Sequence, residues 1–471
     1  MRRGIVAKKE LFRQLPSIDG IIQKKKIQDL MEQYSEKFVK EQIRLVVDGY
    51  RKKILNLPDN GVLNIREEEV IQDICQSVKD LFKPSFVRTL NGTGTVVHTN
   101  LGRSLLAKEA VDHMMEVSTA YSNLEYDIKK GERGSRYNII TEILTRITGA
   151  EDALIVNNNA AAVFLMLNSM AKGKETIVSR GELVEIGDSF RISSIMEESG
   201  TNLVEVGATN KTHLYDYENE ISEDTAVLMK VHTSNFKILG FHESVSIEEL
   251  VLLGEKYNIP VVEDLGSGTL IDFTPYGLSP ERTVMEALEE GADLVSFSGD
   301  KILGGPQAGI IVGKKKYIDA LKKNQLLRAF RVDKFTLAAL ESTLLLYLDP
   351  KDAMEKIPTL RLMTMDEKKL QEKAEKLKEQ LSSLDGLKIR IIDGVSTVGG
   401  GAFPMEELPT KVIAITSNQP AHVIEEKLRL SSIHLIGMIR EEEYLLDIRC
   451  LFEEDFEKIK EVLENILEDD Q

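Results

Sequence analysis

The fold is decided by residues 293–306, which read DLVSFSGDKILGGP. The apolar run 294–297 predicts a buried strand of a parallel sheet, and the small polar residues after it predict a turn that presents Lys301. Beyond this lysine, Gly304, Gly305 and Pro306 prevent a helix from starting and let the backbone pass close to a bulky group. A lysine in such a turn suits a Schiff base with a carbonyl cofactor, which needs a neutral amine in a partly desolvated pocket. The alternative is an ordinary solvated lysine after a strand.

A second strand of the buried type ends in carboxylates. Residues 258–268 read NIPVVEDLGSG and place Asp264 at the end of an apolar run. Ligands of open α/β sheets bind outside the carboxyl ends of the strands, so Asp264 and Lys301 are expected to face one site. Pyridoxal 5′-phosphate needs such a pair, because a lysine holds its aldehyde and an aspartate keeps its pyridine nitrogen protonated. The sequence therefore predicts that this cofactor binds here.

The third segment of this kind is residues 153–162, which read ALIVNNNAAA. The pattern predicts a strand, a polar turn and the start of a helix. Free amide groups at a helix start bind phosphate and asparagine side chains add donors, so Asn158, Asn159 and Ala160 are assigned to the cofactor. Ser298, at the end of the 294–297 run, joins this set. The alternative for the asparagines is a plain helix cap, but the matching strand-end positions of Asp264 and Lys301 favour the cofactor.

The composition predicts a large globular protein. A chain of 471 residues that is 42% hydrophobic can bury a large core and is expected to form two or three domains. No apolar run is long enough to span a bilayer, and the basic N-terminus lacks the apolar core of a secretion signal. Cys75 and Cys450 are too few for a disulfide scaffold and do not have metal-ligand spacing. We therefore expect a cytoplasmic protein without a metal site.

Charge is distributed unevenly along the chain. Residues 1–60 carry 14 Lys and Arg against 8 Asp and Glu, a net of +6, which leaves −23 on the remainder. The basic clusters at 24–26 and 51–53 lie on helical patterns. A basic module on an acidic body indicates a contact with nucleic acid. The alternative is a solvated helical face that keeps the protein soluble.

The chain reads as three domains of an α/β protein. Residues 1–85 show short amphipathic helices, with breaks at Pro16, Pro58 and Pro84. Residues 86–350 alternate apolar strands with helices, which predicts a large, mostly parallel sheet that ends at Pro350. Residues 351–471 begin with one charged helix, from about 354 to 384, and continue as a small α/β domain. The expected strands are 153–156, 176–179, 203–206, 226–231, 260–263, 294–297, 309–312, 412–416, 433–438 and 444–448, and the expected helices are 247–256, 283–290, 336–348, 421–428 and 454–467.

Taken together, these segments resemble one family, the bacterial selenocysteine synthases or seryl-tRNA(Sec) selenium transferases. The resemblance runs nearly end to end and departs at Ser104, Leu105 and Lys237, where a small residue, a proline and an arginine are expected. It implies a fold-type-I pyridoxal-phosphate enzyme, a large ring-shaped homo-oligomer (a decamer) and an N-terminal domain that grips the tRNA. The motifs that carry it are LPSID at 15–19, NGTGTVVHTNLGR at 91–103, RGELVEIG at 180–187, VHTSNF at 231–236, SGDK at 298–301, GGPQAG at 304–309 and RAFRVDK at 328–334.

The resemblance implies that seryl-tRNA(Sec) is converted to selenocysteinyl-tRNA(Sec). Lys301 would hold the cofactor, yield it to the serine amino group and act as general base and acid, with Asp300 beside it as a further catalytic residue. Loss of the serine hydroxyl would give an aminoacrylyl-tRNA, to which selenium from selenophosphate adds. The candidates to bind the selenophosphate dianion are Arg103, Arg328 and Arg331, because guanidinium groups bind phosphate bidentately.

Two of these assignments have structural alternatives. Arg328 and Arg331, three residues apart, could share one face of a helix as ordinary surface charge. His232, directly after the expected strand 226–231, is assigned to the cofactor as a residue that stacks on or near its ring. A histidine with a purely structural hydrogen bond is the alternative.

Three other functions compete with this interpretation. A related fold-type-I ammonia-lyase, acting on a small phosphorylated amino acid or sugar acid, would use the same cofactor residues, but it needs no basic module at 1–60. A cysteine desulfurase needs a cysteine on a mobile loop, whereas Cys75 lies in a helical pattern and Cys450 follows an expected strand. A non-enzymatic RNA-binding protein would leave Asp264 and Lys301 unexplained.

Overall fold

The chain forms two compact units, residues 1–88 and residues 89–471. The structure, a computed structural model, describes residues 2–58, 63–183, 185–186 and 190–468. Within them, no helix is both long enough and apolar enough to cross a membrane.

The first unit is a helical bundle. Its helices are α1 (Arg2–Gln14), α2 (Ile18–Ile22), α3 (Lys25–Gln33), α4 (Glu36–Leu55) and α5 (Glu67–Leu81). The apolar positions of the amphipathic patterns form its core, in which Ile27, Val39, Ile43 and Ile74 are buried. The predicted helices are therefore confirmed. The prolines that were expected to break them lie between the helices or after the last one. At 20 residues, α4 is longer than the short helices that the sequence indicated.

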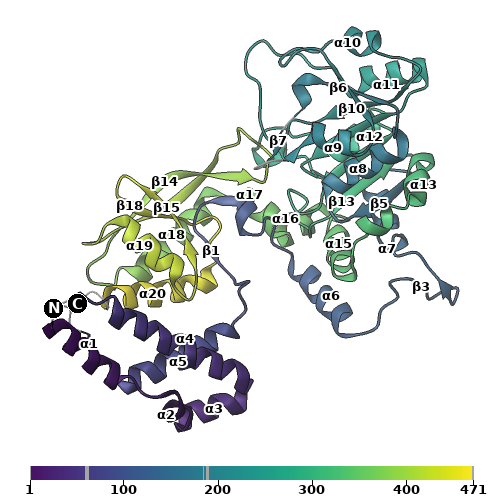
Figure 1. Cartoon of the computed structure of the whole chain (residues 1–471). Helices are drawn as coiled ribbons and strands as arrows, with labels where there is room; N and C mark the ends of the chain where they lie inside the picture. Colours follow the sequence, from purple (N-terminus) through teal and green to yellow (C-terminus); the bar gives the residue numbers. More distant parts are fainter. Residues whose placement is uncertain (1, 59–62, 184, 187–189, 469–471) are drawn as a thin grey trace. The chain divides into compact units, whose positions relative to one another are not determined.

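The second unit is built on a seven-stranded sheet in the order β5-β13-β12-β11-β10-β6-β9 (Figure 1). Only β13 runs antiparallel to its neighbours β12 and β5, so the predicted mostly parallel sheet is confirmed. Every strand of this sheet was expected from the sequence. Their bounds are β5 (Asp152–Val156), β6 (Glu175–Ser179), β9 (Asn202–Val206), β10 (Thr225–Val231), β11 (Val261–Gly266), β12 (Leu294–Ser298) and β13 (Gly309–Gly313).

Successive residues of these strands enter two different cores, because side chains of a strand alternate between its faces. In β5, Ala153 and Ile155 pack in one core, and Leu154 and Val156 in the other. The first core is closed by α7 (Asn138–Thr148), α11 (Ile247–Tyr257), α12 (Val284–Glu289) and α15 (Lys334–Leu346). The second is closed by α8 (Asn159–Met170), α9 (Ile192–Glu198) and α13 (Lys315–Lys323). The result is a three-layer α/β/α arrangement, in which both faces of the sheet are covered.

A second, five-stranded sheet has the order β17-β18-β15-β14-β2. It consists of β2 (Thr95–Val97), β14 (Lys388–Gly399), β15 (Leu408–Thr416), β17 (Met438–Arg440) and β18 (Glu443–Asp447). Helices α18 (Glu367–Leu381), α19 (Ala421–Leu430) and α20 (Phe456–Glu468) contribute to its core. The strand β1 (Leu90–Asn91) pairs with β16 (Leu435–Ile436). Strands from residues 90–97 thus pair with strands from the region after residue 350. The expected domain boundary between residues 350 and 351 stays a prediction.

The single charged helix expected at 354–384 is wrong. The chain forms three helices there, α16 (Pro350–Lys356), α17 (Pro358–Met363) and α18. Pro358 cannot donate to a preceding helical carbonyl, so it ends α16 and occupies the first turn of α17. Asp366 then begins α18 by accepting a hydrogen bond from the backbone of Lys369. Pro350 likewise occupies the first turn of a helix, α16.

The remaining helices and strands lie outside the two large sheets and their covering helices. They are α6 (Lys108–Thr119), β3 (Tyr126–Asp127), β4 (Glu132–Arg133), β7 (Glu185–Ile186), β8 (Phe190–Arg191), α10 (Leu214–Asn219) and α14 (Leu327–Phe330).

Replacing Gly309 by alanine should destabilise the protein. A Cβ at Gly309 would overlap the carbonyl group of Asn158, which is backbone and has no room to move. We expect Gly309→Ala to lower the free energy of unfolding by roughly 1–3 kcal/mol, the usual cost of overpacking. The measurement is urea unfolding followed by circular dichroism. Gly49→Ala is the control, since a Cβ there meets nothing within 4 Å. Equal loss in both variants would contradict the packing argument.

Candidate active site

The predicted site residues meet at one edge of the large sheet. Asn157, His232 and Asp264 lie at the carboxyl ends of β5, β10 and β11, and Lys301 follows the end of β12. These four strands run in the same direction, so their carboxyl ends share one edge. This is the edge where open α/β sheets bind ligands.

Asp264 is buried and tightly held. Its carboxylate accepts hydrogen bonds from Asn159 Nδ2 at 2.7 Å and from Ser296 Oγ at 2.9 Å. Burial raises the pKa of Asp264, against the lowering effect of these hydrogen bonds and of the Lys301 charge. Both side-chain donors bind Oδ1 of Asp264, so Oδ2 receives neither of them and is suited to face a cationic nitrogen.

The turn at residues 157–160 has two functions. Asn158 caps α8, because its side chain accepts from the backbone N–H of Ala161 at 2.8 Å. The alternative interpretation of Asn158, a residue that caps a helix, therefore agrees with its observed contact. Asn159 directs its Nδ2 to Asp264, while its Oδ1 is buried without a hydrogen-bond partner among the described residues. The backbone amides of Asn159 and Ala160 stay at the start of the helix, where a phosphate group binds favourably.

Lys301 is 8% exposed. Burial lowers the pKa of Lys301, while the charges of Asp264 and Asp300 oppose that shift. A Cβ placed on Gly266 would lie 3.8 Å from Lys301 Nζ and 3.6 Å from Ser234 Oγ, so the amine and this hydroxyl approach the same glycine. Gly266 has a φ of 66°, a conformation that favours glycine.

Asp300 links the lysine turn to Arg103. Arg103 donates from Nη1 to Asp300 Oδ2 at 2.8 Å, and both residues line a cavity of about 440 Å³ together with Gln307. Ser104, one of the departures from the family pattern, donates its backbone N–H to the carbonyl of Asp300 at 3.3 Å. Its hydroxyl donates to the carbonyl of Lys301. The serine side chain at position 104 therefore adds a hydrogen bond to the turn that carries Lys301.

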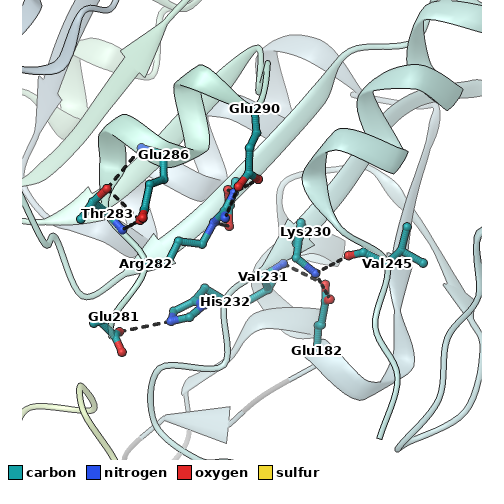
Figure 2. A network of polar contacts seen from close by, with 11 residues as sticks. Glu182, Lys230, Val231, His232, Val245, Glu281, Arg282, Thr283, Glu286 and Glu290 are labelled. Carbon is teal, nitrogen blue, oxygen red and sulfur yellow. Dashed lines mark hydrogen bonds and ion pairs between the residues drawn. The ribbon is translucent and has the colours of Figure 1, made fainter. Parts of the chain in front are cut away.

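His232 takes part in a group of polar contacts that Figure 2 shows from close by. Its Nε2 is 3.2 Å from Glu281 Oε1, and its backbone N–H donates to the carbonyl of Asp264 at 2.9 Å. In Figure 2 the imidazole points toward Glu281, while Arg282 points toward Glu290. Arg282 also donates to the fully buried Glu263 at 2.7 Å. This network fixes the orientation of the imidazole and supports the residues next to Asp264.

Arg328 and Arg331 are exposed and flank Phe330. The carbonyl of Phe330 accepts from the backbone N–H of Asn157 at 2.9 Å, which places this segment beside the start of α8. Neither side chain forms a hydrogen bond or ion pair with a residue that the structure describes, although the charge of Arg331 contributes to lowering the pKa of Glu125. The structure therefore brings both close to the 157–160 turn but does not join them to Asp300 or Lys301.

Four residues of the site were missed by sequence reasoning, namely Ser104, Ser234, Glu281 and Ser296. Ser234 and Ser296 lie in segments that the sequence did single out, at 231–236 and 293–306. For Ser296, the available signal was a polar residue within an otherwise apolar strand. Glu281 lies in a loop and had no such signal. In the motif 180–187, Glu182 binds Lys230 at 2.8 Å, whereas Val184 and Gly187 lie outside the described residues.

Comparison with known families identifies the chain. Residues 89–452 match the family described as L-seryl-tRNA selenium transferase, and residues 12–51 match the family described as selenocysteine synthase N terminal. The chain belongs to the L-seryl-tRNA selenium transferase family. The family resemblance found in the sequence is thereby confirmed.

Relatives within the L-seryl-tRNA selenium transferase family match over almost their whole length. L-seryl-tRNA(Sec) selenium transferase of Clostridium botulinum (strain 657 / Type Ba4) is 51% identical over 462 residues, covering 98% of this chain and 99% of the relative. The protein of the same name from Alkaliphilus oremlandii (strain OhILAs) is 49% identical over 468 residues, covering 98% and 100%.

The solved structure of D-glucosaminate-6-phosphate ammonia-lyase has a similar fold, with a TM-score of 0.54 and 21% identity. The match covers 81% of this chain and 96% of that one. At this identity the likeness concerns the fold alone. The predicted fold class is confirmed, a fold-type-I α/β protein with a large mixed sheet and a helical N-terminal region.

Replacing Asp264 by asparagine should lower the pKa of Lys301 further. The negative charge of Asp264 favours the ammonium form of Lys301, so its removal lets the proton leave at lower pH. The measurement is the pH dependence of trace acetylation of Lys301 in cofactor-free protein, read by mass spectrometry. Asp272→Asn is the control, because the carboxylate of Asp272 binds Thr274 instead. A midpoint that stays in place or rises in Asp264→Asn would refute the coupling.

Proposed function

We propose that this chain converts seryl-tRNA(Sec) into selenocysteinyl-tRNA(Sec) with pyridoxal 5′-phosphate as cofactor. The observation that carries the proposal is the buried pair of Asp264 and Lys301 at adjacent strand ends, in a chain 51% identical to an L-seryl-tRNA(Sec) selenium transferase. A free tRNA-binding module would not need an amine and a carboxylate held in this way.

The residues present fit this cofactor. Lys301 offers a buried amine of lowered pKa for the aldehyde, and Asp264 offers a carboxylate for the pyridine nitrogen. The start of α8 offers amide groups for the phosphate. Asn159 Oδ1 and Ser267 Oγ, next to these residues along the chain or in space, are buried without partners among the described residues. When bound, the cofactor supplies a sink for the electrons left behind when serine loses its α proton.

The protein residues move the protons of the reaction. Lys301, whose pKa is lowered by burial, would be the base that accepts the proton from the serine Cα, and as an ammonium group it would protonate the leaving hydroxyl. Asp264 would stabilise a positive charge on the pyridine nitrogen. His232, held by Glu281, lies next to Asp264 at the neighbouring strand end and is proposed to pack on the cofactor ring. Ser298 and the 157–160 turn are proposed to complete the cofactor contacts.

The selenium donor is proposed to be selenophosphate, bound by Arg103, Arg328 and Arg331. Arg103 is held toward the site by Asp300, and the side chains of the other two arginines form no ion pair with a described residue. Serine would lose its hydroxyl as water and selenium would take its place at Cβ, while a water molecule takes up the phosphoryl group of the donor, which leaves as inorganic phosphate. Bidentate guanidinium groups suit such an oxyanion.

The first unit is proposed to hold the tRNA. Residues 1–88 carry 18 Lys and Arg against 13 Asp and Glu, a net of +5, and leave −22 on the second unit. Lys25, Lys26 and Arg44 are exposed on this unit. We further propose a cytoplasmic, ring-shaped homo-oligomer, a decamer by family resemblance, which sedimentation of the purified protein would test.

The function is tested by identifying the aminoacyl product. Purified protein is incubated with selenophosphate and with seryl-tRNA(Sec), seryl-tRNA(Ser) or free serine, and the product is analysed by mass spectrometry. We expect selenocysteine only on tRNA(Sec), and no product from Lys301→Ala, which should also lose the visible absorbance of the bound cofactor. Lys314→Ala, at a lysine that pairs with Asp293, is the control and should keep both. Ammonia release from a small phosphorylated substrate, with no selenocysteine formed, would favour the lyase alternative.

Removing residues 1–88 should abolish salt-sensitive tRNA binding. The acidic second unit would repel a polyanion, whereas phosphate contacts to a basic unit weaken steeply with salt. Affinity for seryl-tRNA(Sec) is measured against salt concentration for the full chain and the shortened one, with the cofactor absorbance as the check that the second unit is folded. Equal affinities that do not vary with salt would remove the first unit from this role.

A further inference from the structure

A cavity of about 270 Å³ lies in the C-terminal part of the second unit, away from the residues assigned above. It is formed by α17, α18 and the residues that follow β18. Its lining includes the apolar residues Met365 and Phe452. The charged residues of the lining are four cations and two carboxylates: Arg361, Lys369, Lys373, Lys376, Glu372 and Glu453.

Lys373 is the unusual member of this lining. It is 7% exposed, and its Nζ donates only to the carbonyl of Arg449, at 3.3 Å. The ring centroid of Phe452 lies 6.0 Å from the same atom. No carboxylate of the described residues lies within ion-pair distance of it. An ammonium group is thus buried without a direct ion-pair partner, and the charges of Glu453 and Asp447 act on it only from farther away. Such an arrangement costs stability unless an anion compensates it.

Another buried lysine of the described chain shows what Lys373 lacks. Lys411 pairs with both Glu367 and Asp393. Lys373 and the site lysine, Lys301, have no carboxylate within ion-pair distance among the described residues, and more distant carboxylates oppose the effect of burial on the pKa of both.

The charges around Lys373 act in both directions. Burial lowers the pKa of Lys373 to about 8 and the positive charge of Arg361 adds to this effect, while Cys450, Glu453 and Asp447 oppose it. The guanidinium group of Arg361 has no hydrogen-bond or ion-pair partner among the described residues, whereas Lys376 is paired with Glu453 at 2.8 Å. Four cations thus line the cavity against two carboxylates, and two of these cations have no ion-pair partner among the described residues.

We propose that this cavity binds a phosphate group through Lys373 and Arg361. An ammonium and a guanidinium group together match the charge and the several acceptor oxygens of phosphate. The cavity is smaller than the roughly 300–1,000 Å³ that accommodates drug-sized ligands, so a small anion or one phosphate of a chain fits it better than a cofactor does. The phosphate can be free or part of a tRNA backbone. The site goes beyond the proposed catalytic function and does not depend on it.

The experiment measures the reactivity of Lys373 in the full-length, cofactor-loaded protein. Trace acetylation at pH 7 is quantified by tandem mass spectrometry in inorganic phosphate and in chloride of equal ionic strength. Phosphate should lower the acetylation of Lys373 roughly tenfold, because raising the pKa by one unit lowers the neutral fraction about tenfold. Lys368, which is 87% exposed on the same helix, is the internal control and should not change.

Two variants and a second ligand complete the test. Arg361→Met should remove the protection of Lys373, whereas Lys368→Met should preserve it. Protection by uncharged tRNA(Sec) at micromolar concentration, with free phosphate acting only at millimolar concentration, identifies a tRNA phosphate as the occupant. Protection by inorganic phosphate but not by tRNA identifies a free anion. If neither ligand slows the acetylation of Lys373, or if Arg361→Met leaves the protection intact, the proposal is overturned.

Discussion

The structure depends on the burial of opposite charges at one edge of a parallel sheet. Asp264 and Lys301 are each 8% exposed and follow adjacent strands, and burial shifts the pKa of each toward its neutral form. A buried ion pair contributes little to stability by itself, since desolvation offsets attraction. What it provides is two groups whose protonation responds to whatever binds between them. The surrounding polar residues serve to keep this pair in place.

That support comes from several distant segments of chain. Asn159 and Ser296 hold the carboxylate of Asp264, and Ser104 holds the carbonyl of Lys301. Next to Asp264 along the chain, Glu263 accepts a hydrogen bond from Arg282, which also donates to Glu290. Site residues held in this way lose little freedom when a ligand binds, which favours both affinity and rate.

The sequence predicted every strand of the large sheet because these strands are local signals, short apolar runs that end in polar turns. The same logic placed Asp264 and Lys301 at one edge, since parallel strands leave little other choice. It failed for β14, whose residues alternate between half-buried and exposed positions and include Asp393 and Gly394. Glu281 was missed because its contact with His232 is purely tertiary. The roles of Arg328 and Arg331 stay predictions.

The pairing of β2 with β14 bears on how the protein is made. The hydroxyl groups of Thr95 and Thr397, which are 302 residues apart in the sequence, form a hydrogen bond. The chain leaves β2 and soon reaches Arg103 and Ser104, which contact the lysine turn. Contacts of such long range form late, because a long loop must close first. During synthesis on a ribosome, β2 would stay unpaired until β14 had been made, which is most of the chain. The turn at Lys301 would therefore be complete before Arg103 could be positioned beside it.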